Sequence, residues 1–109
     1  MEEFVKGNVV VIPFPFSDLS GSKRRPALVI ADLHGDDILL CQITSQNSKD
    51  SLAFALNATN FISGSLPVNS FIRPLRIFTA DKNIIIRKAG KITPLLMDKV
   101  INTIIFTIS

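Results

Sequence analysis

Apolar residues in this chain gather in short runs that are separated by polar or proline-containing segments, a pattern typical of β-strands. The runs predict about six or seven short strands, with candidates at residues 9–12, 26–31, 38–45, 52–56, 69–72, 76–78 and 83–88. Pro13 and Pro15 follow the first run, and because proline cannot donate to a central ladder, this segment is expected at a strand end, an edge or a bulge. The segments between the runs, such as 17–25 and 57–64, are expected to be loops and connections.

The hydrophobic period changes after Thr93. Apolar residues then recur every three or four positions, which predicts an amphipathic helix containing Leu96, Met97, Val100, Ile101, Ile104, Ile105 and Ile108. Thr93 and Pro94 form a favourable start for it, a hydroxyl N-cap followed by proline at the first helical position. Short strands followed by one helix predict a mainly β (α+β) fold, a small, strongly curved, mostly antiparallel sheet or barrel closed by a C-terminal α-helix.

The size and composition of the chain narrow the class of protein. With 109 residues, 47% hydrophobic and 19% charged, it is expected to form a single domain over residues 1–109 rather than a disordered segment. No apolar run approaches the roughly 20 residues that cross a bilayer, and the acidic start is not a secretory signal, so a cytoplasmic protein without a membrane partner is expected. Ile104, Ile105 and Ile108 together exceed what a small barrel needs to bury, which predicts a homodimer.

The sequence lacks the motifs of common nucleotide-binding and metal-dependent proteins. The sequence has no Walker A loop, no dinucleotide-binding glycine pattern and no His-Glu pair at metal-binding spacing. One cysteine, Cys41, forms no intramolecular disulfide, and with His34 it is too little for a structural zinc site. We therefore expect no metal and no cofactor. The net charge of +3 permits a polyanionic partner without requiring one.

Basic residues stand where two of the predicted strands could present them to an anion. Lys23, Arg24 and Arg25 close a polar loop at the start of an apolar strand, and a guanidinium group binds phosphate oxygens in a bidentate way. The alternative is a solvated loop. Arg73 lies on another apolar strand, where it indicates either a binding partner or an edge-strand charge that prevents aggregation.

Hydroxyl, amide and aromatic side chains provide further candidates for binding a phosphate, a ribose hydroxyl or a base. Thr44, Ser45 and Gln46 end a buried strand, where they could bind phosphate or ribose, or could simply cap a turn. Phe16 and Phe54 are candidate platforms for base stacking, although most of the phenylalanines are needed in the core.

Five motifs in a fixed order carry a resemblance to a known family. They are the strand opening at 6–11, Arg-Pro followed by apolar residues at 25–30, Ile-Thr-Ser at 43–45, Phe-Thr-Ala-Asp at 78–81, and 88–92 leading into the helix. Over about residues 6–108, their order and spacing resemble the MazF/PemK/Kid toxins of type II toxin–antitoxin systems.

This resemblance implies an SH3-like barrel with a C-terminal helix, a homodimer, and sequence-specific cleavage of single-stranded RNA without a metal ion. It also implies a cognate antitoxin whose flexible, often acidic segment occupies the RNA groove. Carried over position by position, Arg25 matches an active-site arginine, Thr44 an active-site hydroxyl, and Arg73 a second arginine that donates a proton in the PemK/Kid branch. Ser45 matches an RNA contact, and Phe54 falls near an RNA-contacting aromatic residue of some members. Lys23, Arg24, Gln46 and Phe16 complete the expected RNA-binding set.

The chemistry of RNA is compatible with these residues. The 2′-OH is an internal nucleophile, so the protein needs to orient it, move a proton and stabilise the phosphorane, giving a 2′,3′-cyclic phosphate. One position departs from the family: Leu75 stands where the PemK/Kid branch has an aspartate that acts as a base. This departure keeps one alternative open, a catalytically degenerate RNA-binding or protein-interaction module on the same fold. The low net charge and the apolar surface keep a second one open, a structural or interaction domain without a nucleic-acid role.

Overall fold

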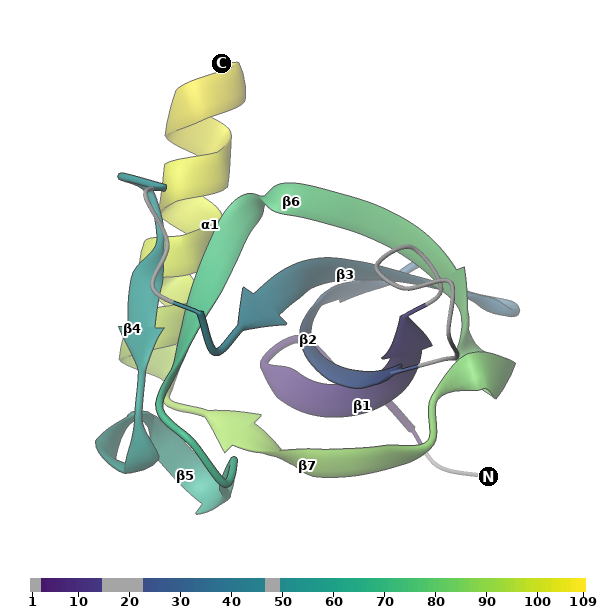
Figure 1. The fold of residues 1–109 in the computed structure, drawn as a ribbon. Helices are drawn as coiled ribbons and strands as arrows, with labels where there is room; N and C mark the ends of the chain where they lie inside the picture. Colours follow the sequence, from purple (N-terminus) through teal and green to yellow (C-terminus); the bar gives the residue numbers. More distant parts are fainter. Residues whose placement is uncertain (1–2, 15–22, 47–49) are drawn as a thin grey trace.

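The computed structural model of the chain describes residues 3–14, 23–46 and 50–109 (Figure 1). Within these residues the strands are β1 (Asn8–Phe14), β2 (Lys23–Asp32), β3 (Asp37–Thr44), β4 (Phe54–Leu56), β5 (Phe61–Gly64), β6 (Ser70–Asp81) and β7 (Arg87–Ile92). Two short 3-10 turns, η1 (Ala58–Asn60) and η2 (Lys82–Ile84), precede β5 and β7, and helix α1 (Pro94–Ile108) ends the chain.

The strands form one antiparallel sheet in the order β4-β6-β3-β2-β1-β7-β5. Figure 1 shows this sheet curling round on itself, with α1 running beside β4 and β6. The two edge strands, β4 and β5, are joined only by η1 and the residues flanking it, so the edges of the sheet are held near each other. The result is an antiparallel half-barrel with one C-terminal helix, which confirms the predicted fold class.

Two buried clusters lie on opposite faces of the central strands. The helix-side cluster is built from Val9, Val11, Leu28, Ile30, Cys41, Ile43, Leu56, Ile72, Ala89, Ile92, Leu96, Met97, Val100 and Ile104. The second cluster is built from Phe4, Val10, Ile12, Ala27, Val29, Ile38 and Leu40. Successive residues of a strand point to opposite faces. Strands β1, β2 and β3 therefore need apolar residues at almost every position, which explains their unbroken apolar runs.

Helix α1 begins and docks as its sequence predicts. The Thr93 side chain accepts a hydrogen bond from the Leu96 amide (3.3 Å), and Pro94 occupies the first turn. Ile104 belongs to the core, at 8% exposure, whereas Ile105 (54%) and Ile108 (75%) stay in solvent in the single chain. Among the described residues, no helix is long and apolar enough to span a membrane.

The predictions for the segments that form β5 and β7 are wrong. The expected strand at 83–88 is instead η2 followed by β7, because the Asp81 side chain caps a turn by accepting a hydrogen bond from the Asn83 amide (2.8 Å). The expected connection at 57–64 contains β5, which pairs with β7. Gly64 and Gly90 allow this pairing, since a Cβ on either would clash with a backbone carbonyl oxygen of the opposite strand.

Strand β6 runs unbroken across Pro74, where two separate strands were expected. Its pairing with β3 jumps from Cys41 opposite Ile77 to Gln42 opposite Arg73. The intervening residues of β6 form a bulge, which accommodates a proline that cannot donate to the ladder. This irregularity fixes the position at which Arg73 crosses the neighbouring strand.

Candidate functional site

The register of the central strands brings three of the predicted site residues to one face of the sheet. Gln42 of β3 pairs with Ala27 of β2 on one side and with Arg73 of β6 on the other. Paired residues project from the same face, and so do residues two apart along a strand. Arg25 lies two residues before Ala27, and Thr44 lies two residues after Gln42. Arg25, Thr44 and Arg73 therefore share the face opposite the helix-side cluster.

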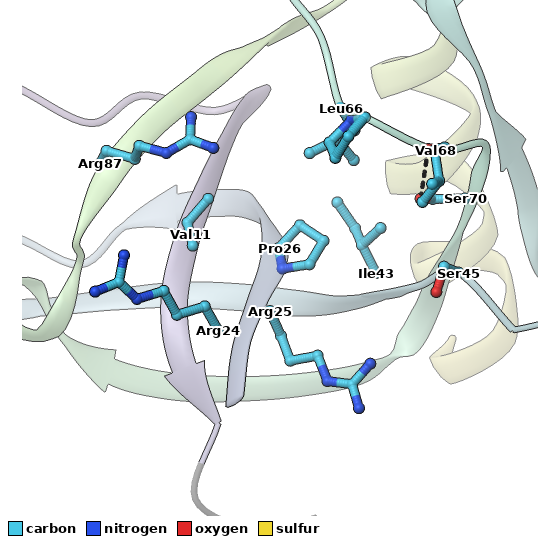
Figure 2. Close-up of a pocket in the computed structure, with 11 residues that line it drawn as sticks. Val11, Arg24, Arg25, Pro26, Ile43, Ser45, Leu66, Val68, Ser70 and Arg87 are labelled. Carbon is cyan, nitrogen blue, oxygen red and sulfur yellow. Dashed lines mark hydrogen bonds between the residues drawn. The ribbon is translucent and has the colours of Figure 1, made fainter. Parts of the chain in front are cut away.

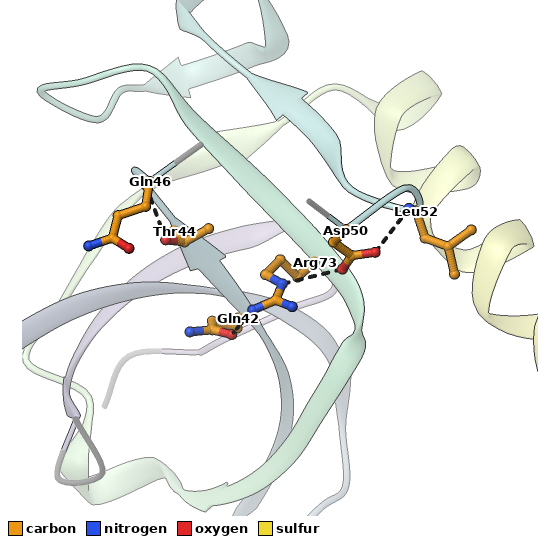
Figure 3. A network of polar contacts seen from close by, with 6 residues as sticks. All are labelled: Gln42, Thr44, Gln46, Asp50, Leu52 and Arg73. Atoms are coloured by element: carbon orange, nitrogen blue, oxygen red, sulfur yellow. Dashed lines mark hydrogen bonds and ion pairs between the residues drawn. The ribbon is translucent and has the colours of Figure 1, made fainter. Parts of the chain in front are cut away.

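Arg73 is held from two sides on this face (Figure 3). Its Nε donates to Oδ2 of Asp50 at 3.2 Å, and its Nη1 donates to Oε1 of Gln42 at 3.4 Å. The side chains of Arg73 and Asp50 are only 22% and 18% exposed, so this ion pair is largely withdrawn from water. The planar guanidinium is thus fixed in direction as well as in place.

Asp50 is itself fixed by the start of the chain segment that leads to β4. Its Oδ1 accepts a hydrogen bond from the Leu52 amide at 2.9 Å. That hydrogen bond and the neighbouring Arg73 guanidinium hold the pKa of the Asp50 carboxyl below its ordinary value. Asp50 is therefore a carboxylate at neutral pH and supplies the negative charge that matches Arg73.

The polar residues that end β3 divide between the two faces. The Thr44 hydroxyl oxygen accepts a hydrogen bond from the Gln46 amide at 3.2 Å, which is the turn-capping role expected as one alternative. Its hydroxyl hydrogen remains a donor on the same face as Arg73. Ser45 lies on the next position of the chain and lines a pocket on the other face.

This pocket has a volume of about 290 Å³ and combines an apolar floor with a basic rim (Figure 2). Its lining consists of Val11, Pro26, Ile43, Leu66, Pro67 and Val68, with Arg24, Arg25, Arg87, Ser45 and Ser70 as polar members. Figure 2 shows the Arg25 guanidinium turned away from those of Arg24 and Arg87. Arg25 lines the pocket, and the strand register also assigns its side chain to the face that carries Thr44 and Arg73.

The structure locates the remaining predicted residues as follows. Gln46 is exposed beside Thr44, and Phe54 is half-buried and packs against the helix-side cluster. Lys23 begins β2. Phe16 lies outside the described residues. Leu75, 38% exposed on β6, has no group that exchanges a proton.

Three polar residues of the site escaped the sequence prediction. Gln42 interrupts an apolar run, and that interruption was the available signal. Asp50 sits in a polar stretch with nothing to mark it, because its partner Arg73 is distant in the chain. Arg87 falls in the segment whose strand boundaries were predicted wrongly. In the described part of the chain, no group of three or more His, Cys, Asp or Glu side chains could hold a metal ion.

Comparisons with known proteins identify similar sequences and folds. A family model described as "PemK-like, MazF-like toxin of type II toxin-antitoxin system" matches residues 5–108. A MazE–MazF complex from Deinococcus radiodurans has a chain with a TM-score of 0.76 and 17% identity, covering 100% of this chain and 98% of that one. No curated protein sequence matches.

Two mycobacterial structures have the same fold. An endoribonuclease in complex with its cognate antitoxin, from a mycobacterial species, has a TM-score of 0.74 and 16% identity, covering 95% of this chain and 93% of that one. The Mycobacterium tuberculosis toxin MazF-mt6 has a TM-score of 0.70 and 15% identity, covering 89% and 91%. At these identities the solved structures establish the fold.

Proposed function

The chain belongs to the PemK-like, MazF-like toxin family of type II toxin–antitoxin systems, and from this premise we propose that it cleaves single-stranded RNA at specific sequences. The reaction proceeds without a metal ion, through attack of the 2′-OH on the adjacent phosphate. The products are a 2′,3′-cyclic phosphate and a 5′-hydroxyl. A cognate antitoxin holds the toxin inactive.

The shared face of Arg25, Thr44 and Arg73 is the observation that carries this proposal. Two guanidinium groups and a hydroxyl on adjacent strands suit a phosphodiester, which offers two non-bridging oxygens and gains charge in the transition state. The bond from the 2′-oxygen to phosphorus forms as the bond from phosphorus to the 5′-oxygen breaks. The 2′-OH loses one proton and the leaving 5′-oxygen gains one.

Each residue has a distinct role in this scheme. Arg25 binds the scissile phosphate and takes part in proton transfer. Thr44 donates a hydrogen bond that positions the reacting group, and its capping bond from Gln46 fixes the direction of the hydroxyl. Arg73 is a second phosphate ligand that stabilises the phosphorane. Losing one such contact typically costs about 10²–10³ in rate, by analogy with a single oxyanion donor.

The rest of the RNA runs along the basic rim of the pocket. Arg24 is exposed there, as is Arg87, which we add to the RNA-binding set of Lys23, Ser45, Gln46, Phe16 and Phe54. Phosphate contacts of this kind fix the position of the strand, and unstacked bases supply the sequence information. An acidic antitoxin segment competes for the same arginines.

Two copies of the chain form the active assembly. The outer side of α1 exposes Ile105 (54%), Phe106 (85%) and Ile108 (75%). Figure 1 shows the end of α1 extending past the sheet. The exposed fractions show that these three side chains have little cover within one chain. Burying them against a second copy removes this apolar surface from water.

End-group analysis tests the reaction. The purified protein is incubated with a long single-stranded transcript in EDTA, and the fragments are examined by primer extension and mass spectrometry. Discrete cuts ending in a cyclic phosphate support the proposal. Salt-dependent RNA binding without any cut, from a protein that is folded, favours the non-cleaving module motivated by Leu75.

A further inference from the structure

We propose that Asp50 is a positioning residue that aims the Arg73 guanidinium at the scissile phosphate, with Gln42 as the second support. This inference rests on the proposed function for its catalytic consequence. Its structural part, the fixed direction of Arg73, stands independently of whether RNA is cleaved.

The hydrogen bonds of Arg73 leave a defined set of donors for a ligand. A guanidinium carries five N–H groups. One on Nε meets Asp50 and one on Nη1 meets Gln42, at 3.2 and 3.4 Å. The remaining donors are on Nη1 and Nη2, and they meet no acceptor among the described residues. These two nitrogens can bind two phosphate oxygens in parallel.

Three features distinguish this contact from an ordinary surface ion pair. Exposed pairs contribute little because both side chains keep their freedom and their water. Here both side chains are largely covered, at 22% and 18% exposure. Asp50 is anchored by the Leu52 amide at 2.9 Å, and Gln42 by its place in β3 between two paired strands, β2 and β6. The Arg73 guanidinium is therefore held between Asp50 and Gln42, each of which is fixed by contacts other than those with Arg73.

The consequence concerns rate more than binding. A guanidinium that swings freely still attracts RNA by its charge, so weak binding survives its loss of direction. Stabilising the phosphorane requires donors already aimed at the oxygens that gain charge. A misplacement of about 1 Å can cost up to about 10²-fold in rate. Removing Asp50 is thus expected to lower kcat far more than it raises KM.

A double-mutant cycle tests this directly. Asp50→Ala, Arg73→Ala and the double variant are compared with the wild type in single-turnover cleavage at saturating RNA. Asp50→Ala is expected to lower the rate by about 10–100-fold, and the double variant to cleave no more slowly than Arg73→Ala. Asp50→Asn, which keeps an oxygen for the Nε–H, is expected to recover part of the rate. Asp98→Asn, which removes an exposed carboxylate from α1, is the matched control and keeps the wild-type rate.

The proposal is overturned if Asp50→Ala cleaves RNA at the wild-type rate. It is also overturned if the rate loss of the double variant equals the product of the losses of the two single variants. A circular dichroism melt shows whether Asp50→Ala loses activity because it unfolds. In that case the cleavage rate of Asp50→Asn tests the proposal: a rate between those of Arg73→Ala and the wild type supports it, and a rate equal to that of Arg73→Ala from a folded protein overturns it. If the wild type does not cleave RNA, the proposed function fails, and NMR of the Arg73 Nε–H decides the positioning separately. A dispersed resonance that collapses on Asp50→Ala supports a fixed guanidinium, and an unchanged resonance refutes it.

Discussion

Replacing Val100 by alanine tests how helix α1 holds the site in place. Val100 is completely buried, in the same cluster as Ile43 and Ile72. These two isoleucines directly precede Thr44 and Arg73 in the chain. The packing of the helix against the sheet therefore supports the strands at the points where they present the proposed catalytic side chains.

The expected loss of stability is a balance of three contributions. Removing the two γ-methyl groups of Val100 from the core costs about 1.6 kcal/mol, at about 0.8 kcal/mol each. The space left behind adds about 1 kcal/mol. Alanine is a better helix former than valine, which returns about 0.5 kcal/mol. Burial wins, and the free energy of unfolding falls by about 2 kcal/mol, or roughly 8 °C in Tm for a domain of this size.

Urea unfolding followed by circular dichroism measures this loss, because the chain lacks Trp and Tyr and offers weak intrinsic fluorescence. Protein concentration is held fixed, since a dimer links stability to concentration. Asn102→Ala, at an exposed position of the same helix, is the control and is expected to be neutral or slightly stabilising. A loss at Val100 below about 0.5 kcal/mol, the size of an ordinary surface effect, or an equal loss at Asn102, would refute the docking of α1 through this face.

Three other perturbations have definite outcomes. Burial raises the pKa of the Cys41 thiol to about 12, so a thiol reagent at pH 8 should label it only after unfolding. Because the pKa of Asp50 is lowered on folding, its carboxylate stabilises the folded protein fully above the ordinary value of 3.8, and this stabilisation is lost as the pH falls below that value. Between about pH 5 and 2 the free energy of unfolding should therefore fall more for the wild type than for Asp50→Asn. Phe106→Lys should convert a dimer into a monomer by light scattering at micromolar concentration, and a wild type that is already monomeric contradicts the α1 interface.

The fold was predictable from the sequence where burial alone determined the pattern of apolar residues. Strands buried on both faces must be apolar throughout, and a docked helix must repeat every three or four residues, so β1, β2, β3 and α1 were recognisable. Strand β5 was missed because its pairing with β7 depends on two glycines rather than on apolar alternation. A proline inside β6 appeared to end the strand, because the bulge that accommodates it is set by the neighbouring strand β3.

The candidate site was predictable as separate residues and not as an arrangement. Arg25, Thr44 and Arg73 were each noticed for residue type and position, but their common face follows from the register across β2, β3 and β6. Asp50 could not be found, because its contact with Arg73 joins positions 23 residues apart. Local sequence patterns do not predict contacts between distant parts of the chain. In this protein such contacts determine the common face of the three residues and the ion pair of Arg73 with Asp50.

The central claim is that the polar face carrying Arg25 cleaves RNA, and neighbouring arginines on opposite faces of β2 provide its most direct test. Wild type, Arg25→Ala and Arg24→Ala are compared in single-turnover cleavage of one transcript in EDTA, with binding measured in parallel. The account predicts a rate loss of about 10²–10³ for Arg25→Ala, and for Arg24→Ala weaker binding with the rate at saturating RNA preserved. Full cleavage by Arg25→Ala, with Arg24→Ala inactive, would move the chemistry to the pocket face and contradict the account.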